Sequence, residues 1–229
     1  MGINERAEFA PASLIKVPLL MAYYYRAEHD PTILDKKILV TGSYDYSQQI
    51  VKPEKELVIG KSYSVSELLD QMIIYSDNFA YNILNENIDV EDIYLVYDNI
   101  GIDMREFNEE NPSGNIIKVN EYSSLFRTLY NASFLNKEYS QKVLDILSQT
   151  RYGEGLNFFL PKDLVVAHKF GERNNLDNNE QQLHDCGIIY SSNPYILCVM
   201  TKGFDREKMS LFIAQTSQLI YQFELTRGK

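Results

Sequence analysis

Residues 11–20 read Pro11-Ala12-Ser13-Leu14-Ile15-Lys16-Val17-Pro18-Leu19-Leu20, and the interpretation of the whole chain starts from this stretch. Positions three apart on a helix share a face, so the amine of Lys16 is expected beside the hydroxyl of Ser13. A serine hydroxyl attacks a carbonyl when a neighbouring base takes its proton, and a lysine with a lowered pKa is such a base. The N–H groups of a helix N-terminus would also stabilise a developing oxyanion. The alternative is a capped surface helix, with Ser13 only its N-cap.

Composition limits the classes of function. The 229 residues fit one domain, or one domain with a lobe, and 45% hydrophobic residues are enough for a core. The net charge of −10 argues against nucleic acid or an anionic membrane surface as a partner. We see no apolar run of membrane-spanning length and no signal peptide. Because the chain begins abruptly, the missing signal decides nothing about compartment.

Two cysteines, Cys186 and Cys198, flank a predicted turn at 191–194. If Tyr190 pairs with Tyr195, the thiols point to opposite faces of the sheet, whereas a shift of one residue would bring them together. We expect two buried free thiols, which say little about compartment. The histidines are scattered and form no metal-type cluster, so neither a metal nor a cofactor is expected.

The order of elements is that of an α+β protein, with helices first and strands after them. We expect one domain over residues 1–229, with a helical lobe at about 13–150 and a sheet with a C-terminal helix at about 160–225. Helices are predicted at about 13–28, 65–74, 90–99, 119–131, 137–149 and 206–224, with another after Asp77. Strands are predicted at 165–171, 186–190 and 195–201. Ser64 and Glu67 form a capping box for the second helix.

Two further polar patches accompany the first. Ser76-Asp77-Asn78 lies in a turn between predicted helices, where Asp77 is expected to cap the second one. Lys169-Phe170-Gly171 lies in a predicted strand. Each patch is weak alone, because Asn78 is also a common turn residue and Lys169 also suits a solvated strand.

In this order, the three patches resemble the motifs of class A β-lactamases and penicillin-binding proteins. Residues 11–16 are similar to the nucleophile motif, 76–80 to the second motif and 169–171 to the third, and 185–187 on the next strand also fit. The resemblance covers most of the chain, from Asn4 to the final helix. It implies a helical lobe and a short antiparallel sheet covered by a C-terminal helix.

The resemblance also implies a role for each residue. Ser13 would attack a carbonyl and form an acyl-enzyme, Lys16 would receive its proton, and Ser76 would pass a proton to the leaving nitrogen. Lys169 would help to keep Lys16 neutral and attract a substrate carboxylate. The backbone N–H groups of Ser13 and Glu172 would form the oxyanion hole. The expected substrate-binding residues are Asn78, Gly171, Glu172 and Arg173.

Two departures from the family concern chemistry. Phe170 stands where the third motif usually has Thr or Ser, whose hydroxyl helps to hold the substrate carboxylate, and Arg173 is a candidate replacement. The loop 103–118 lacks the Glu-x-x-Leu-Asn string whose glutamate activates water for deacylation in class A enzymes. Slow release of the acyl group is therefore expected. The loop glutamates among which spacing does not choose are Glu106, Glu109 and Glu110.

A third departure concerns the fold. Twelve residues precede Ser13, where the family has a helix and two strands. Either an upstream part is missing from this sequence, or the fold is reduced to about three strands. A reduced sheet would expose an edge through which two copies of the chain could pair.

The leading hypothesis is a β-lactamase-like serine hydrolase acting on a β-lactam, a cell-wall peptide, or another amide or ester. Such an enzyme would work outside the cytoplasm, either secreted, periplasmic or membrane-anchored. The alternative is a non-catalytic module that binds peptidoglycan or a partner on a degenerate scaffold. A cytoplasmic esterase is a third hypothesis.

Overall fold

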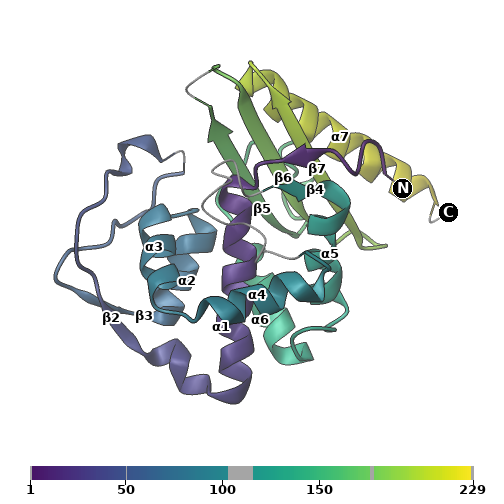
Figure 1. Cartoon of the computed structure of the whole chain (residues 1–229). Helices are drawn as coiled ribbons and strands as arrows, with labels where there is room; N and C mark the ends of the chain where they lie inside the picture. The colour runs from purple at the N-terminus through teal and green to yellow at the C-terminus, as the bar shows by residue number, and fades with distance from the viewer. Residues whose placement is uncertain (1, 50, 103–115, 176–177, 228–229) are drawn as a thin grey trace.

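The computed structural model describes residues 2–49, 51–102, 116–175 and 178–227 (Figure 1). Its α-helices are α1 (Lys16–His29), α2 (Val65–Ile74), α3 (Asn78–Glu86), α4 (Val90–Asn99), α5 (Val119–Tyr130), α6 (Lys137–Leu147) and α7 (Arg206–Arg227). Its strands are β1 (Glu8–Phe9), β2 (Lys37–Leu39), β3 (Ser62–Ser64), β4 (Ile117–Lys118), β5 (Val166–Asn174), β6 (Gln181–Ile189) and β7 (Tyr195–Gly203). Its 3₁₀ helices are η1 (Ala12–Ile15), η2 (Pro31–Asp35) and η3 (Tyr46–Gln48).

Helix α1 is the central element of the helical lobe and runs through it in Figure 1. Residues 17–24 are apolar on all sides of this helix, and most of its residues are buried, with α2, α4 and α6 packed against it. A helix that is hydrophobic all round is stable only inside a core. Pro18 fits in the first turn, where its missing N–H has no intrahelical partner to lose. The rest of the lobe is therefore built around the helix that carries Lys16.

The main sheet is antiparallel in the order β5-β6-β7, and α7 packs on one face of it (Figure 1). Side chains alternate between the two faces. Val166 and Phe170 pack with Met209 and Ile213 of α7. On the opposite face, Ala167 joins the core of the helical lobe. The predicted α+β fold, with a helical lobe and a short sheet covered by the last helix, is confirmed.

The first turn of the predicted helix 13–28 has a different structure from the one expected. Residues 12–15 form the 3₁₀ helix η1, and the α-helix begins at Lys16. Neither helix has a side-chain cap, so the alternative in which Ser13 is only an N-cap is wrong. The predicted capping box of Ser64 and Glu67 is confirmed at the start of α2.

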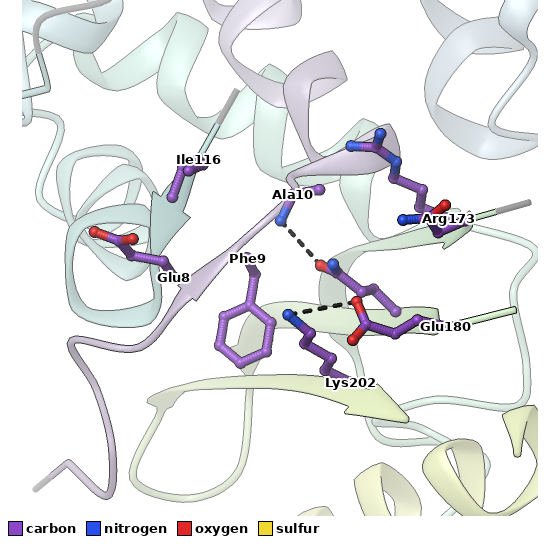
Figure 2. Close-up of a pocket in the computed structure, with 9 residues that line it drawn as sticks. Glu8, Phe9, Ala10, Ile116, Arg173, Glu180 and Lys202 are labelled. Carbon is purple, nitrogen blue, oxygen red and sulfur yellow. Dashed lines mark hydrogen bonds and ion pairs between the residues drawn. The ribbon is translucent and has the colours of Figure 1, made fainter. Parts of the chain in front are cut away.

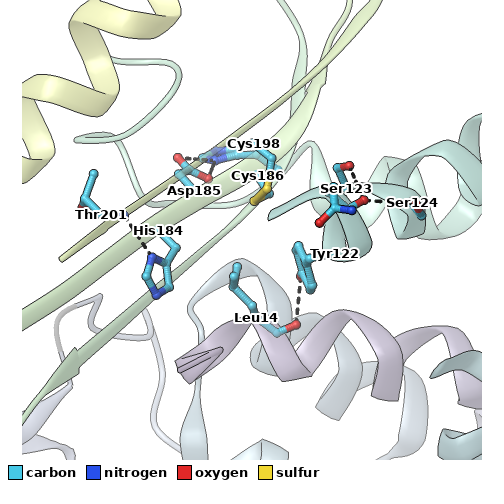
Figure 3. The surroundings of a disulfide bond; sticks show 11 residues. Leu14, Tyr122, Ser123, Ser124, His184, Asp185, Cys186, Cys198 and Thr201 are labelled. Atoms are coloured by element: carbon cyan, nitrogen blue, oxygen red, sulfur yellow. Dashed lines mark hydrogen bonds and ion pairs between the residues drawn. A yellow bond between two sulfur atoms is a disulfide. The ribbon is translucent and has the colours of Figure 1, made fainter. Parts of the chain in front are cut away.

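The cysteines correct a prediction. Ile189, not Tyr190, pairs with Tyr195, so Cys186 lies opposite Cys198, and the two form a disulfide (Figure 3). Tyr190 instead donates its N–H to Val165 O and lies in the connection between β6 and β7, so the register differs by one residue from the one considered. The expectation of two free thiols was therefore wrong.

None of the helices in the described part of the chain is both long and apolar enough to cross a bilayer.

Candidate active site

Lys16 is the centre of a cluster of polar side chains. Its Nζ lies 3.1 Å from Ser13 Oγ, 3.1 Å from Ser76 Oγ and 2.5 Å from Ser76 O. Asn78 Oδ1 lies 2.6 Å from the same nitrogen. Only 1% of Lys16 is exposed. Two motifs that are far apart in the chain therefore surround one buried amine.

The environment of Lys16 favours the unprotonated amine. Burial lowers the pKa of Lys16 to about 7, because an ammonium loses its hydration inside the protein, and the negative charge of Asp77 opposes this shift. A neutral amine has two N–H groups and one lone pair. The N–H groups suit the carbonyl oxygens of Ser76 and Asn78, which leaves the lone pair for a serine hydroxyl. This is the protonation state that a general base requires.

Ser13 lies in η1, directly before α1, and is partly exposed. Ala12 precedes it with a φ of 48°, in the left-handed region that few non-glycine residues adopt. Leu14 donates its N–H to Pro11 O at 3.0 Å, and Tyr122 donates its hydroxyl to Leu14 O at 2.9 Å. The backbone on both sides of Ser13 is therefore fixed, and its hydroxyl is accessible.

Ser76 connects the two lysines of the site. It lies in the turn between α2 and α3 with a φ of 56°, and it is buried. Its Oγ is 3.1 Å from Lys16 Nζ and 2.9 Å from Lys169 Nζ. A hydroxyl both accepts and donates a hydrogen bond, so Ser76 can relay a proton between a base and a reacting atom.

Lys169 projects from β5 towards the helical lobe and is fully buried. Its Nζ donates to Phe170 O at 2.9 Å and lies 4.0 Å from the centre of the Phe170 ring. Burial moves the pKa of Lys169 well below its ordinary value, and the charge of Lys16 lowers it further, whereas Asp185 opposes the shift. A proton on one amine therefore disfavours a proton on the other.

The turn between α2 and α3 is held by side chains that include two the sequence pattern did not single out. Asp77 is the N-cap of α3, as predicted, and accepts the N–H of Phe79 at 2.8 Å. Tyr46 donates its hydroxyl to Asp77 Oδ2 at 3.2 Å, and Gln49 Oε1 accepts the N–H of Asn78 at 3.2 Å. Tyr46 and Gln49 lie between α1 and α2, where the sequence shows no period. Nothing local marked either residue.

The strand pairing directs the N–H of Glu172 to the free edge of β5. The Cα atoms of Cys186 and Cys198 are 4.0 Å apart, which is the close spacing of a non-hydrogen-bonded pair. The backbone N–H and C=O of Cys186 therefore point to β5, where they hydrogen-bond to the backbone of Lys169, the partner of Cys186 in the register. By alternation, the backbone groups of Phe170 and Glu172 face away from β6. In agreement, Phe170 O accepts a hydrogen bond from a lysine side chain.

Gly171 allows β5 to approach η1 closely. A Cβ at this position would lie 2.8 Å from Pro11 O and 3.3 Å from Leu14 N. Both atoms belong to the backbone of the segment that carries Ser13, so they cannot move aside as a flexible side chain would. The contact between β5 and residues 11–14, called here the nucleophile segment, therefore leaves no room for a side chain at position 171.

Phe170 is a core residue. Only 3% of it is exposed, and its ring stacks on Tyr152 with centroids 4.0 Å apart. The ring belongs to the core between the sheet and α7, and Lys169 Nζ lies 4.0 Å from its centre. A packing contact therefore occupies the position at which the family usually has a hydroxyl.

The side chains of Glu172 and Arg173 diverge. Glu172 turns towards α7, where its carboxylate accepts a hydrogen bond from Arg206 Nε at 3.0 Å, and burial raises its pKa. Arg173 is exposed and lies beside Ala10 (Figure 2). The substrate contacts predicted for these two residues stay predictions.

His168 and Asp185 form a buried pair that the sequence did not predict. His168 Nδ1 lies 2.8 Å from Asp185 Oδ1, and Leu156 donates its N–H to Asp185 Oδ2 at 2.9 Å. The pair lies on the α7 face of the sheet, behind Lys169. His168 belongs to β5 and Asp185 to β6, so only the register of these two strands brings the side chains together.

Two other predictions concern groups outside this cluster. The loop glutamates Glu106, Glu109 and Glu110 lie outside the described residues. Across the described ranges, no group of His, Cys, Asp or Glu side chains is arranged to hold a metal ion.

Comparisons with known proteins agree with this fold. The family model described as the beta-lactamase enzyme family matches residues 1–223. The TLA-3 extended-spectrum β-lactamase is 21% identical, with a TM-score of 0.82 over 96% of this chain and 86% of that one. A β-lactamase from Chitinophaga pinensis DSM 2588 is 21% identical, with a TM-score of 0.80 over 98% and 88%. PBP-A is 19% identical, with a TM-score of 0.75 over 97% and 83%. No curated protein matches the sequence.

Proposed function

The chain belongs to the beta-lactamase enzyme family, and we propose that it is a serine acyl-transfer enzyme that uses Ser13 as its nucleophile. The observation that carries the proposal is the position of Lys16 Nζ, 3.1 Å from both Ser13 Oγ and Ser76 Oγ. One buried amine of lowered pKa thus contacts the attacking hydroxyl and the hydroxyl that would deliver the proton. The proposed substrates are a β-lactam or a cell-wall peptide.

The reaction would proceed by transfer of the acyl group to Ser13. Lys16 would take the proton of Ser13 as Oγ bonds to the carbonyl carbon, and the electron pair of the carbonyl would move to its oxygen. The N–H groups of Ser13 and Glu172 would bind this oxyanion. When the carbon–nitrogen bond breaks, the proton would pass from Lys16 through Ser76 to the leaving nitrogen. Asn78 would orient the Lys16 amine.

Lys169 would bind the carboxylate on the leaving-group side. Its amine contacts Ser76 Oγ, so its charge is close to the proton path. Protonated Lys169 would attract the substrate carboxylate and would disfavour a proton on Lys16, and both effects assist attack. Gly171 would keep β5 close to Pro11 and Leu14, on either side of Ser13, where the scissile carbonyl would lie.

We also propose that the protein works outside the cytoplasm. The disulfide between Cys186 and Cys198 supports this compartment, because disulfides persist mainly in oxidising environments.

Intact-protein mass spectrometry with benzylpenicillin tests the acyl-transfer proposal. We expect one covalent adduct on the wild type and none on Ser13→Ala. Ser148→Ala, which changes an exposed serine outside the site, should form the adduct like the wild type. No adduct with penicillins, cephalosporins or peptide thioesters would overturn the proposal and favour the non-catalytic binding module.

A further inference from the structure

A surface cavity lies beside the nucleophile segment, at the end of β5. It has a volume of about 220 Å³, and its lining includes Phe9, Ala10, Arg173, Gln182 and Lys202 (Figure 2). Ala10 is three residues before Ser13 in the sequence. The cavity is therefore close to the segment that carries the proposed nucleophile, and none of its lining residues takes part in the acyl transfer proposed above.

The segment before Ser13 crosses the sheet from β6, which Ala10 contacts, to β5, where Pro11 lies next to Gly171. Gln182 Oε1 accepts the N–H of Ala10 at 2.9 Å, and Ala10 O lies 3.0 Å from His184 Nε2. Gln182 and His184 both belong to β6, and Gln182 faces Arg173 in the strand register, so Ala10 is held over β6 beside the end of β5. The Ser13 end of the segment reaches Gly171 instead, two residues nearer to Lys169.

Lys169 and Arg173 are therefore on opposite sides of the proposed reaction centre. Both project from the same face of β5, four residues apart, which corresponds to about 13 Å along a strand. A carbonyl held between Ser13 and the Glu172 N–H would have its leaving group on the Lys169 side. Its acyl group would extend towards Arg173.

The charges around the cavity leave one cation available. Lys202 Nζ pairs with Glu180 Oε1 at 3.4 Å. Arg173 is exposed, and its guanidinium has no hydrogen bond or ion pair with any residue in the ranges that the structure describes. In Figure 2 its side chain extends towards Ala10, whereas the side chain of Glu8, the other acid of the lining, points the opposite way.

We infer that Arg173 and this cavity bind an anionic group on the acyl side of the substrate, such as a carboxylate on the acyl chain. The inference rests on the proposed acyl transfer to Ser13. It assigns Arg173 a role in specificity, separate from the leaving-group carboxylate near Lys169. A guanidinium matches a carboxylate with two parallel hydrogen bonds, which makes it suited to this recognition.

Two penicillins that differ by one carboxylate test the inference. Benzylpenicillin and its α-carboxybenzyl analogue share the same bicyclic nucleus and differ only by one carboxylate on the acyl side. The second-order rate of Ser13 acylation should be higher for the α-carboxy compound. In Arg173→Gln, the ratio of the rate with the α-carboxy compound to the rate with benzylpenicillin should fall by about five- to tenfold.

Matched variants separate binding from a general effect of charge. Lys202→Gln removes one positive charge from the same cavity but from a residue already paired with Glu180, and it should keep the preference. Arg173→Lys should keep part of it. An unchanged preference in Arg173→Gln, or an equal loss in Lys202→Gln, would overturn the inference while leaving the proposed function intact. No adduct with either penicillin would overturn both.

Discussion

At the scale of single residues, two buried lysines share one serine hydroxyl. Lys16 and Lys169 each contact Ser76 Oγ, and each lowers the probability that the other is charged. In an enzyme that needs a neutral base and a positive group for the substrate, this coupling is useful. A bound substrate carboxylate would raise the pKa of Lys169 and so favour a proton on Lys169 beside a neutral Lys16. The two amines then have different roles because their partners differ.

The pKa of Lys16 predicts the pH dependence of acylation. Its value of about 7 means that the amine is protonated below this pH and able to act as a base above it. The second-order rate of acylation should therefore rise with pH through about 7 and then level. Stopped-flow measurement with a chromogenic cephalosporin gives this profile. Asp77→Asn should shift the midpoint to lower pH, because the charge of Asp77 raises the pKa of Lys16.

A matched change checks that this shift is local. Asp35→Asn removes an exposed carboxylate outside the site, so the midpoint should stay where it is in the wild type. A rate that is flat between about pH 5 and 9 would contradict the assignment of Lys16 as the base.

At the scale of elements, β6 pairs on one side with β5, which carries Lys169, and is joined on the other side to β7 by the disulfide. The Cys186–Cys198 pair fixes which backbone groups of β6 face β5, and so which N–H groups β5 leaves free. One residue of slip between β6 and β7 would separate the two thiols and move them to opposite faces. The disulfide therefore holds the register of the strands behind the proposed oxyanion hole.

Removal of this disulfide should destabilise the protein. The cysteines are 12 residues apart, and closure of so short a loop corresponds to about 2–3 kcal/mol of stability. We expect Cys186→Ala/Cys198→Ala to lower the free energy of unfolding in urea by about this amount. The wild type in reductant should resemble the double variant.

Thiol titration of the unfolded protein gives an independent check. No thiol should react before reduction, and both cysteines should react after it. Reaction of both thiols in protein purified without reductant would contradict the disulfide.

At the scale of the whole molecule, the proposed site exists only where the two lobes meet. Ser76 comes from a turn of the helical lobe, Lys169 comes from the sheet, and η1 lies between them. The contact between η1 and β5 is a backbone contact at Gly171, with no space for a Cβ. The relative position of the lobes therefore determines the distance between nucleophile and proton relay.

Gly171→Ala tests this dependence. The new methyl would meet Pro11 O at 2.8 Å, so the strand and η1 must separate. We expect the free energy of unfolding to fall by about 1–3 kcal/mol, as for overpacking of a core. We expect acylation to slow by at least about tenfold, because a small displacement of a nucleophile is costly.

Gly153→Ala provides the control for this variant. A Cβ at Gly153 would meet no atom within 4 Å, so stability and acylation should both stay near the wild type. Normal acylation by Gly171→Ala would show that the site tolerates movement between the lobes.

The sequence was sufficient for much of the fold, because local signals are strong in this chain. The capping box at Ser64 and the cap at Asp77 predicted where α2 and α3 begin, and apolar periodicity predicted the later helices. Residues 103–115, where the loop glutamates lie, are outside what the structure describes, so the deacylating residue stays a prediction.

By itself, then, the sequence determined the order of helices α1 to α7 and of strands β5 to β7, and which residue types could do chemistry, since propensity, capping and periodicity act over a few neighbouring residues. Only the tertiary structure decided the rest. It brought Lys16 and Lys169 to the hydroxyl of Ser76 and paired Cys186 with Cys198. It also placed Gln49 beside Asn78 and His168 beside Asp185. These contacts depend on strand register and on packing between segments far apart in the chain, and no local pattern of residues encodes either of them.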